Sequence, residues 1–470
     1  MEQHSSLGLL QTLVGFDTVS QHSNLALIHF VRDYLAQYGI ASQLVGNEEG
    51  TKANLYATIG PTDRGGVMLA GHTDVVPVAG QHWSCDPFHL TVRDGRVYGR
   101  GAADMKGFIA SVLAAVPALA AARLHTPVHI ALTYDEEIGC IGVRRLLDVL
   151  GGLPVLPQMA IVGEPTLMRL VAAHKGKVAY RVRLRGKEGH SSNPAAGVNA
   201  VEYAAELITF IRQLARDRVA SGPFDPLYEV PYTTLHVGKM QGGTALNIIP
   251  AESAFEFEIR HLPEDDPEPL LHAIFSHARE RLLPAMRAVD EAADIEFVEL
   301  SSYPGLLTAP DATVVRFMQS LLGDDRAPAK IAFGTEAGLF SQRVGIPAGA
   351  GEDAAQQRAE QAGQPPRQAA PLHHRHDPRP QAQRPRHGQC QLHGGGRTLH
   401  GRRCHSGQHS LHRAAHQRRR HHQRPHQTHR HEMCLLSRAR CGAYFSLCRE
   451  NMRRHSAIFV ETTGLLAKSS

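Results

Sequence analysis

The chain has 470 residues, 42% of them hydrophobic, a formal net charge of +5 and seven cysteines. This length exceeds that of a usual single hydrophobic core, so we expect two domains. No apolar run reaches the roughly 18 residues of a membrane span, and the N-terminus lacks the basic and apolar order of a leader peptide. We therefore expect a cytoplasmic protein with no membrane partner.

Charge and cysteine content exclude two kinds of site in the main body. Residues 351–470 hold 21 Lys and Arg against 7 Asp and Glu, whereas residues 1–350 hold 29 against 38. The basicity therefore belongs to the C-terminal segment, and we expect no nucleic-acid binding by the main body. Only Cys85 and Cys140 precede residue 350. Their scarcity favours a reducing compartment and offers no cysteine-based zinc site.

The N-terminal region predicts an α/β fold. Apolar residues recur at helical spacing in Leu25–Tyr38, and Gly39 is a stop signal. Short strands are expected around Gln43 and at Asn54–Ile59. The apolar run Val67–Ala70 lies between glycines and does not alternate with polar residues, which predicts a buried parallel strand.

His72 and Asp74 follow that strand at its carboxyl end. Residues two apart in an extended chain point to the same side, and α/β folds bind ligands at this edge of the sheet. A metal-binding histidine usually donates its other ring N–H to a carboxylate, a role that suits Asp74. The alternative is a surface histidine beside a turn aspartate.

Next come a hairpin and a helix. Asp94 and Gly95 form the expected two-residue turn of a hairpin over Leu90–Val97. Asp104 stands just before an Ala-rich segment that predicts a helix to about Ala122. A carboxylate is favoured at a helix start, so a plain N-cap is the alternative to a binding role for Asp104.

Two further strands end in carboxylates. Pro127–Thr133 is followed by Asp135, Glu136 and Glu137, whose charges repel unless cations or solvent compensate them. This segment is either a solvated loop or a cation site with one carboxylate left over as a base. Glu164 follows the strand Met159–Val162. Together with His72 and Asp104, these positions favour a polar site at the carboxyl edge of one sheet.

Four segments in this order resemble the di-zinc aminoacylase and peptidase family, which includes acetylornithine deacetylases, succinyl-diaminopimelate desuccinylases and carboxypeptidase G. They are His72-Thr73-Asp74-Val75-Val76-Pro77, Gly99-Arg100-Gly101 to Asp104-Met105-Lys106-Gly107, Asp135-Glu136-Glu137 and Gly163-Glu164-Pro165-Thr166. The resemblance covers about residues 1–347. It implies an α/β di-zinc exopeptidase-like catalytic domain with a mixed sheet between helices.

The resemblance also implies an activity, a cofactor and roles for individual residues. The implied reaction is deacetylation of N2-acetyl-L-ornithine, with desuccinylation or deacylation of a related amino acid as the alternative. Two Zn²⁺ ions per subunit are expected, although imidazole and carboxylate ligands also suit Co²⁺ or Mn²⁺. The expected ligands are His72 and Glu164 at one zinc, Glu137 at the other and Asp104 between them. The expected general base is Glu136, and Asp74 would orient His72.

Residues 177–290 predict a compact α+β insert. Alternation of apolar and polar residues indicates a sheet with one buried face. The expected elements are strands at Val178–Leu184, Thr233–Val237 and Ala254–Ile259 and helices at about Val198–Arg216 and Pro269–Leu283.

By the resemblance, this insert is a lid and dimerisation domain of a homodimer. His190 would stabilise the oxyanion in the partner subunit's site, and Asn247 and Arg260 would contact a substrate carboxylate. From the residues alone, His190 is a loop histidine and Arg260 a solvated strand residue.

The chain is then expected to return to the catalytic domain. Ile295–Leu300 predicts a strand of that domain, and Ala312–Leu322 a helix. Lys330–Phe340 resembles the substrate loop of the family, with Thr335 as a substrate contact. Gly345–Pro347 begins the next strand, where the resemblance stops. The expected division is 1–176 and 291–347 for the catalytic domain, 177–290 for the lid, and 348–470 for a tail.

The tail lacks hydrophobic periodicity. Gln, Arg, His, Pro, Gly and Ala dominate residues 348–431, and 16 of the 30 histidines follow residue 350. Such a composition cannot offset chain entropy by burial, so we expect disorder. The alternatives are a histidine-rich metal-storage tract and a shifted reading frame. The resemblance places a second-zinc histidine soon after Gly345, but the nearest are His373, His374 and His376. We therefore expect one tightly held zinc and slow deacetylation.

Overall fold

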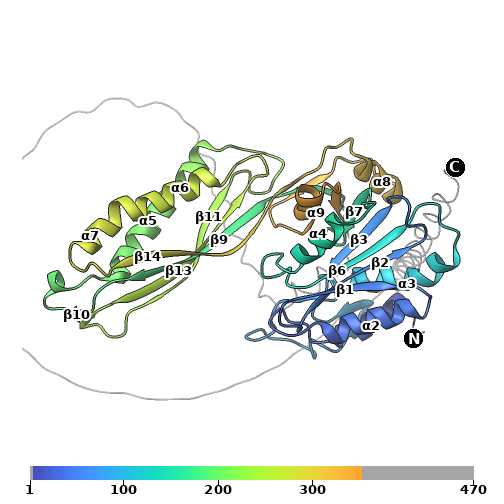
Figure 1. Ribbon diagram of the computed structural model, residues 1–470, viewed down its shortest axis with the longest axis horizontal. Coiled ribbons are helices and arrows are strands. Elements are labelled where there is room, and N and C mark those ends of the chain that lie inside the picture. Colours follow the sequence, from blue (N-terminus) through green and yellow to red (C-terminus); the bar gives the residue numbers. More distant parts are fainter. Residues whose placement is uncertain (1–3, 352–470) are drawn as a thin grey trace, which may run out of the picture. The chain divides into compact units, whose positions relative to one another are not determined.

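The computed structural model describes residues 4–351, which form a nine-stranded sheet and a four-stranded sheet with their helices (Figure 1). The expectations for the tail, including those for His373, His374 and His376, fall outside the described residues. No helix within residues 4–351 has the length and apolar character needed to cross a membrane.

The nine-stranded sheet is mixed. β6, β3, β7 and β17 run parallel, whereas β1, β2, β8 and β15 add antiparallel pairings, and β16 (Ala329–Ile331) pairs with β8. In order across the sheet the strands are β1 (Ser42–Gly46), β2 (Ala53–Ile59), β6 (Val128–Thr133), β3 (Val67–His72), β7 (Met159–Val162), β17 (Ala348–Ala350), β8 (Val171–His174) and β15 (Leu306–Leu307).

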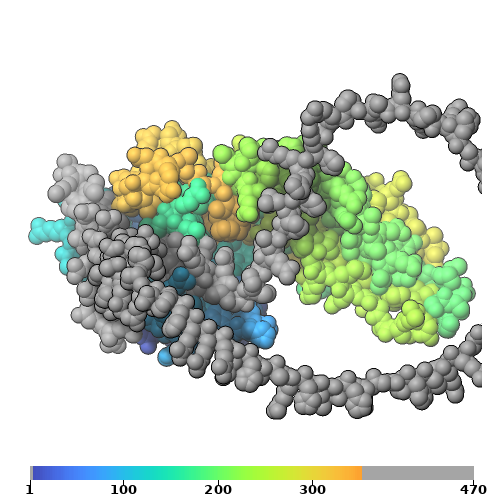
Figure 2. Space-filling model, turned by 180° about the vertical axis from the view of Figure 1, so that it is seen from behind, coloured from blue at the N-terminus to red at the C-terminus, as the bar shows by residue number. Residues whose placement is uncertain are grey.

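Helices cover both faces of this sheet, which is why its central strands are apolar on both sides. α1 (Ser6–Val14), α2 (Leu25–Ala36), α3 (Lys106–Ala121) and α8 (Thr313–Leu322) pack on one face, against Leu55 and Leu69 among others. α4 (Val143–Gly151) and α9 (Ala337–Val344) pack on the other, against Met68 and Ala70. The segment holding α8 and α9 is orange in the space-filling view (Figure 2). This segment lies late in the chain, and its two helices complete the helical layers on both faces of the sheet.

The parallel strands bring distant segments to one edge of the sheet. Val67–His72 is buried throughout, and His72 stands in register with Thr133 at the carboxyl ends of β3 and β6. The expected buried parallel strand is therefore confirmed. The hairpin is also confirmed, as β4 (Thr91–Arg93) and β5 (Arg96–Tyr98). Both its turn residues, Asp94 and Gly95, have the positive φ angles that this tight turn requires.

The four-stranded sheet has one covered face. Its order is β11 (Thr234–Gly242), β13 (Glu252–His261), β9 (Gly176–Arg185) and β14 (Asp294–Tyr303), and all its pairings are antiparallel. Phe255, Phe257 and Ile259 pack beneath helices α5 (Ala200–Ser221), α6 (Glu268–Ser276) and α7 (Leu283–Arg287). Glu256 and Glu258 occupy the other face, in ion pairs with basic residues of the neighbouring strands. The predicted alternation is thus confirmed.

Three expectations need correction. The strand predicted at Ile295–Leu300 does not join the nine-stranded sheet, because β14 pairs with β9 over its whole length. The helix predicted at Pro269–Leu283 is divided into α6, a π-helical turn at His277–Leu282 and α7. The strand expected to begin at Gly345–Pro347 begins at Ala348 instead, after the expected boundary at residue 347, and pairs with β7 at residues 348–350.

His174, at the end of β8, is held as a neutral imidazole inside the protein. Its side chain is fully buried, Nδ1 lies 2.9 Å from the Lys175 carbonyl oxygen, and Nε2 accepts the N–H of Gly338 at 3.2 Å. A proton on Nε2 would face that N–H group, so charging the ring breaks a contact between β8 and α9. In agreement, burial lowers the pKa of His174 to about 4.

We expect protonation of His174 to lower the free energy of unfolding at acid pH. The unfolded chain takes up the proton near pH 6.5, so the contribution of His174 is complete above that pH and is lost as the pH falls towards 4. The loss amounts to about 3 kcal/mol. Urea unfolding of wild type and His174→Gln between pH 7.5 and 4.5 tests this. The stability deficit of the variant should shrink as the pH falls, and a deficit independent of pH would contradict the prediction.

Candidate active site

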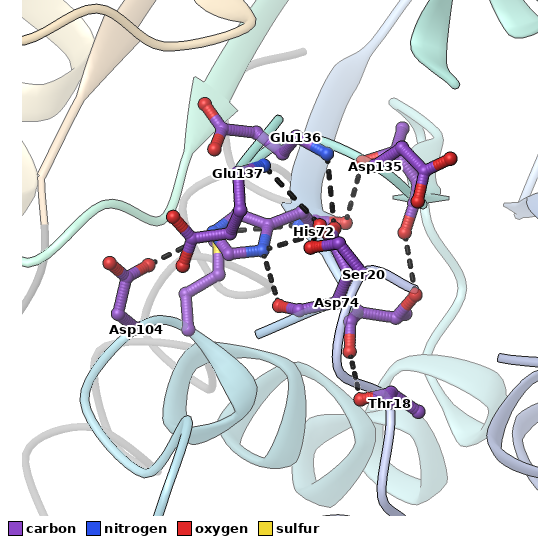
Figure 3. A network of polar contacts seen from close by, with 12 residues as sticks. Thr18, Ser20, His72, Asp74, Asp104, Asp135, Glu136 and Glu137 are labelled. Atoms are coloured by element: carbon purple, nitrogen blue, oxygen red, sulfur yellow. Dashed lines mark hydrogen bonds and ion pairs between the residues drawn. The ribbon is translucent and has the colours of Figure 1, made fainter. Parts of the chain in front are cut away.

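A cluster of polar side chains lies at the carboxyl edge of the nine-stranded sheet (Figure 3). His72 ends β3 and is 1% exposed, and its Nε2 lies 2.9 Å from Oδ1 of Asp104, just before α3. Glu164, also buried, follows β7. Ligand atoms of His72, Asp104 and Glu164 all lie within 4.8 Å of one another. The end of β3, the segment before α3 and the loop after β7 thus converge on one point at the carboxyl edge of the sheet, where α/β folds bind ligands.

Asp74 holds the turn that carries Glu136 and Glu137. Its carboxylate accepts the backbone N–H groups of Glu136 and Glu137 at 3.1 and 3.3 Å, and the hydroxyl of Ser20 at 2.7 Å. His72 Nδ1 is nearer to the Asp74 carbonyl oxygen, at 2.9 Å, than to its carboxylate, at 3.6 Å. Both groups of Asp74 therefore serve the cluster: the carbonyl orients His72, and the carboxylate fixes the acidic turn.

The repulsion expected among Asp135, Glu136 and Glu137 is relieved at one of them. Lys52 Nζ lies 2.6 Å from Asp135 Oδ1 and also donates to the Ser20 carbonyl. This ion pair is largely shielded from solvent. Within residues 4–351, no lysine or arginine forms an ion pair with Glu136, Glu137 or Glu164. Lys52 therefore compensates Asp135, whereas Glu136, Glu137 and Glu164 are stabilised in their ionised form by His72.

The electrostatics of the cluster suit a cation. Burial raises the pKa of Glu136 to about 7 and that of Glu137 to about 8, His72 opposes the rise, and neighbouring carboxylates add to it. Burial and the Asp104 carboxylate raise the pKa of Glu164 well above its usual value. Burial alone would lower the pKa of His72, but its hydrogen bonds to Asp104 and Asp74 raise it well above the usual value. A divalent metal ion would stabilise the ionised carboxylates and the neutral imidazole, so this donor set fits one.

Four other predicted site residues are not part of this cluster. His190 is exposed on β10 (Gly189–His190), and its ring bonds to Ser192. Asn247 is exposed, and the Arg260 side chain bonds to Glu258. Thr335 is fully buried, and its hydroxyl accepts the N–H of Ala337 at the start of α9. The described residues therefore bring together His72, Asp104 and Glu164 beside the turn of Glu136 and Glu137, and the four residues expected to bind substrate or oxyanion have contacts elsewhere or are exposed.

Several residues around the cluster were not predicted from the sequence. Ser20 and Lys52 support the acidic turn from loops that carry no recognisable motif. Cys140 donates its thiol to Oε1 of Glu136 at 3.4 Å. Glu336 accepts the hydroxyl of Thr133 from the far end of the chain. The contacts of Ser20, Lys52 and Glu336 have no spacing that marks them, because each partner is at least 54 positions away. Cys140, in contrast, lies only four residues after Glu136.

The fold and the acidic cluster define a class of hydrolytic enzyme. The profile of peptidase family M20/M25/M40 matches residues 68–363, more than half of the chain. The chain belongs to this family, and the resemblance inferred from the four motifs is confirmed.

Curated relatives agree with this assignment. The chain is 35% identical over 328 residues to an acetylornithine deacetylase of Pasteurella multocida, covering 69% of this chain and 82% of that protein. It is 34% identical over 329 residues to an acetylornithine deacetylase of Proteus mirabilis, with 69% and 81% covered. The expectation of a hydrolytic enzyme is thereby confirmed.

Solved structures share the fold. An M20 metallo-carboxypeptidase from Sulfolobus solfataricus aligns with a TM-score of 0.59 at 19% identity, covering 74% of this chain and 90% of that one. A Bacillus subtilis protein described as a dinuclear metal-binding M20 peptidase aligns with a TM-score of 0.51 at 16% identity, with 75% and 91% covered. The expected fold class is thereby confirmed.

Proposed function

We propose that this enzyme removes the acetyl group from N2-acetyl-L-ornithine, giving ornithine and acetate, a reaction of arginine biosynthesis. The observation that carries the proposal is the convergence of His72, Asp104 and Glu164 beside the turn of Glu136 and Glu137. Such a site supports amide hydrolysis. The names of the relatives at 34–35% identity support the choice of substrate.

His72, Asp104 and Glu164 would hold one divalent metal ion, with Asp104 and Glu137 contributing to a second. Zn²⁺ suits one imidazole with carboxylates, and Co²⁺ or Mn²⁺ is the alternative. When bound, such an ion polarises the amide oxygen and lowers the pKa of water. Asp74 keeps this ligand set in place, since its carbonyl oxygen orients the His72 ring and its carboxylate holds the turn bearing Glu137.

Glu136 would act as the general base. It takes a proton from the attacking water and passes it to the nitrogen of the leaving amine, so that the C–N bond breaks without releasing an unstable amide anion. Its backbone is fixed by Asp74, and its Oε1 accepts the Cys140 thiol. Burial, against the opposing effect of His72, raises the pKa of Glu136 to about 7, which suits a group that must both accept and return a proton.

Hydrolysis of paired substrates tests the proposed activity. The purified full-length chain, loaded with Zn²⁺ or Co²⁺, should release acetate from N2-acetyl-L-ornithine faster than it releases succinate from N-succinyl-diaminopimelate. Ornithine lacks the second carboxylate of that alternative, so the two substrates differ in both acyl group and charge. Faster desuccinylation would reject the proposed substrate in favour of the alternative. Hydrolysis of neither compound would reject both candidate substrates.

We further propose that the unit of the four-stranded sheet forms the lid of a homodimer. It spans residues 177–290 and β14, which the pairing with β9 adds to the expected range. His190 is exposed in this unit and can therefore meet a second copy of the chain, where it would stabilise the oxyanion. Asn247 and Arg260 would contact the substrate carboxylate from the same unit. Thr335 would contact substrate only after leaving its buried position.

Mixed dimers test the shared site. His190→Ala and Glu136→Gln chains should each be inactive alone, since each lacks one essential group in every site. After subunit exchange, a mixed dimer holds one site with both Glu136 and the partner's His190, so about half of the wild-type turnover per mixed dimer should return. Exchange is checked separately with differently tagged chains. Exchanged but inactive mixtures would contradict the shared site.

A further inference from the structure

Glu336 is a buried acid that the proposed reaction does not use. It stands at the start of α9 and is 1% exposed. Its Oε2 accepts the Thr133 hydroxyl at 2.9 Å, whereas its Oε1 is buried and has no hydrogen-bond partner within residues 4–351. A buried carboxyl oxygen without a partner costs free energy, so its presence points to a compensating charge.

The groups around Glu336 lie in or beside the cluster of polar side chains at the carboxyl edge of the sheet. Thr133, its hydrogen-bond partner, stands in register with His72 at the carboxyl edge of the sheet. Burial and then the Glu136 carboxylate raise the pKa of Glu336 to about 8, Asp74 adds to the rise, and His72 and Thr133 oppose it. Burial, followed by the charges of Glu136 and Glu336, raises the pKa of the Cys140 thiol, which donates to Glu136. No lysine or arginine of the described chain forms an ion pair with Glu336.

We propose that Glu336 is an anionic positioning residue that strengthens divalent-metal binding at His72, Asp104 and Glu164 without touching the metal. This inference rests on the metal site of the proposed function. In a low-dielectric interior a charge acts beyond contact distance, so an ionised carboxylate bonded to Thr133, the residue in register with His72, would attract a cation held by His72, Asp104 and Glu164. The bound cation in turn keeps the carboxylate ionised.

Two other roles fit the geometry less well. A cationic group of a substrate cannot reach an oxygen that solvent does not reach, and Glu336 is almost fully buried. A purely structural role, in which Glu336 links α9 to β6 by a hydrogen bond, explains the contact with Thr133. It does not explain why Oε1 is buried without a partner. A neutral glutamine amide at this position would accept the Thr133 hydroxyl equally well. The charge of Glu336 is therefore the property to be tested.

Metal affinity of Glu336→Gln tests the charge directly. The glutamine keeps the shape and can still accept the Thr133 hydroxyl, and Zn²⁺ affinity of the full-length chain is measured by competition with a chromophoric chelator. We expect about tenfold weaker binding at the cluster, in the range seen when groups around metal ligands are removed. His72→Ala identifies the cluster within the titration, and Glu336→Gln should have no further effect in that background.

Two matched variants separate charge from shape. Thr133→Val breaks the hydrogen bond but keeps the carboxylate, so it should weaken Zn²⁺ binding less than Glu336→Gln does. Glu48→Gln removes the same charge from an exposed position paired with Arg145, and it should leave the affinity unchanged. Equal weakening by Thr133→Val and Glu336→Gln, or unchanged affinity in Glu336→Gln, would overturn the proposal.

Thermal unfolding provides a second readout that does not depend on turnover. With chelator, Glu336→Gln should be about as stable as wild type, because the buried charge is gone but the amide NH2 stands without a partner where Oε1 was. With Zn²⁺, its gain in Tm should be smaller than that of wild type. Lower stability with chelator and an unchanged Zn²⁺-dependent gain would make Glu336 a structural residue only. Weakened binding in a chain that hydrolyses neither substrate would leave this inference standing and reject the proposed function.

Discussion

Replacing Glu136 with glutamine should lower kcat by about 10²–10⁴-fold, the usual contribution of a general base. The amide keeps the size of the side chain and the backbone bond from Glu136 N–H to Asp74, but it cannot accept the proton of the attacking water. The Cys140 thiol can still donate to the amide oxygen, so the local packing should persist. Steady-state hydrolysis of N2-acetyl-L-ornithine and metal analysis of the same preparation measure the two effects together.

Glu137→Gln is the matched control for this result. Glu137 lies on the same turn, and its backbone N–H also binds Asp74, so the two variants change the same structure by the same chemistry. We expect Glu136→Gln to retain its metal and Glu137→Gln to lose metal from the second position. Loss of metal with retained turnover in Glu136→Gln would reverse the roles of the two residues.

The full-length chain should hold one Zn²⁺ ion at least about tenfold more tightly than a second, because removal of even an outer partner of a metal ligand costs about 10–100-fold in affinity. Residues 4–351 bring together one group of three ligands, His72, Asp104 and Glu164. The family resemblance expects a histidine soon after Gly345 at the second position, and the nearest ones in the sequence are His373, His374 and His376. Dialysis against graded chelator, followed by metal analysis, measures the order of release.

Two variants assign the sites in that experiment. His72→Ala should remove the tightly held ion, whereas replacement of His373, His374 and His376 together by alanine should not change it. Two ions held with equal affinity and rapid deacetylation would contradict this prediction. If the triple variant then lost one ion, a histidine of residues 352–470 would be the second-site ligand.

Local patterns in the sequence were sufficient for most elements and for the positions of the acidic residues. The apolar run before His72 predicted a buried strand, and Asp94-Gly95 predicted the hairpin turn, because a backbone conformation depends on the residue itself and its neighbours. The alternation in β13 predicted which side of that strand is buried for the same reason. Carboxylates that follow parallel strands must share an edge, so the cluster was also foreseeable.

The partners of these elements depended on the tertiary structure. Ile295–Leu300 was recognisable as a strand, but its alternation is the same in either sheet, and only pairing with β9 decides which sheet it joins. The same holds for the groups that support the cluster. Ser20, Lys52 and Glu336 carry no local signal, since each acts through a contact with a residue at least 54 positions away. The sequence alone thus determined which groups stand at the strand ends. The fold determined their charge balance, because burial and long-range contacts set the electrostatic environment of each group.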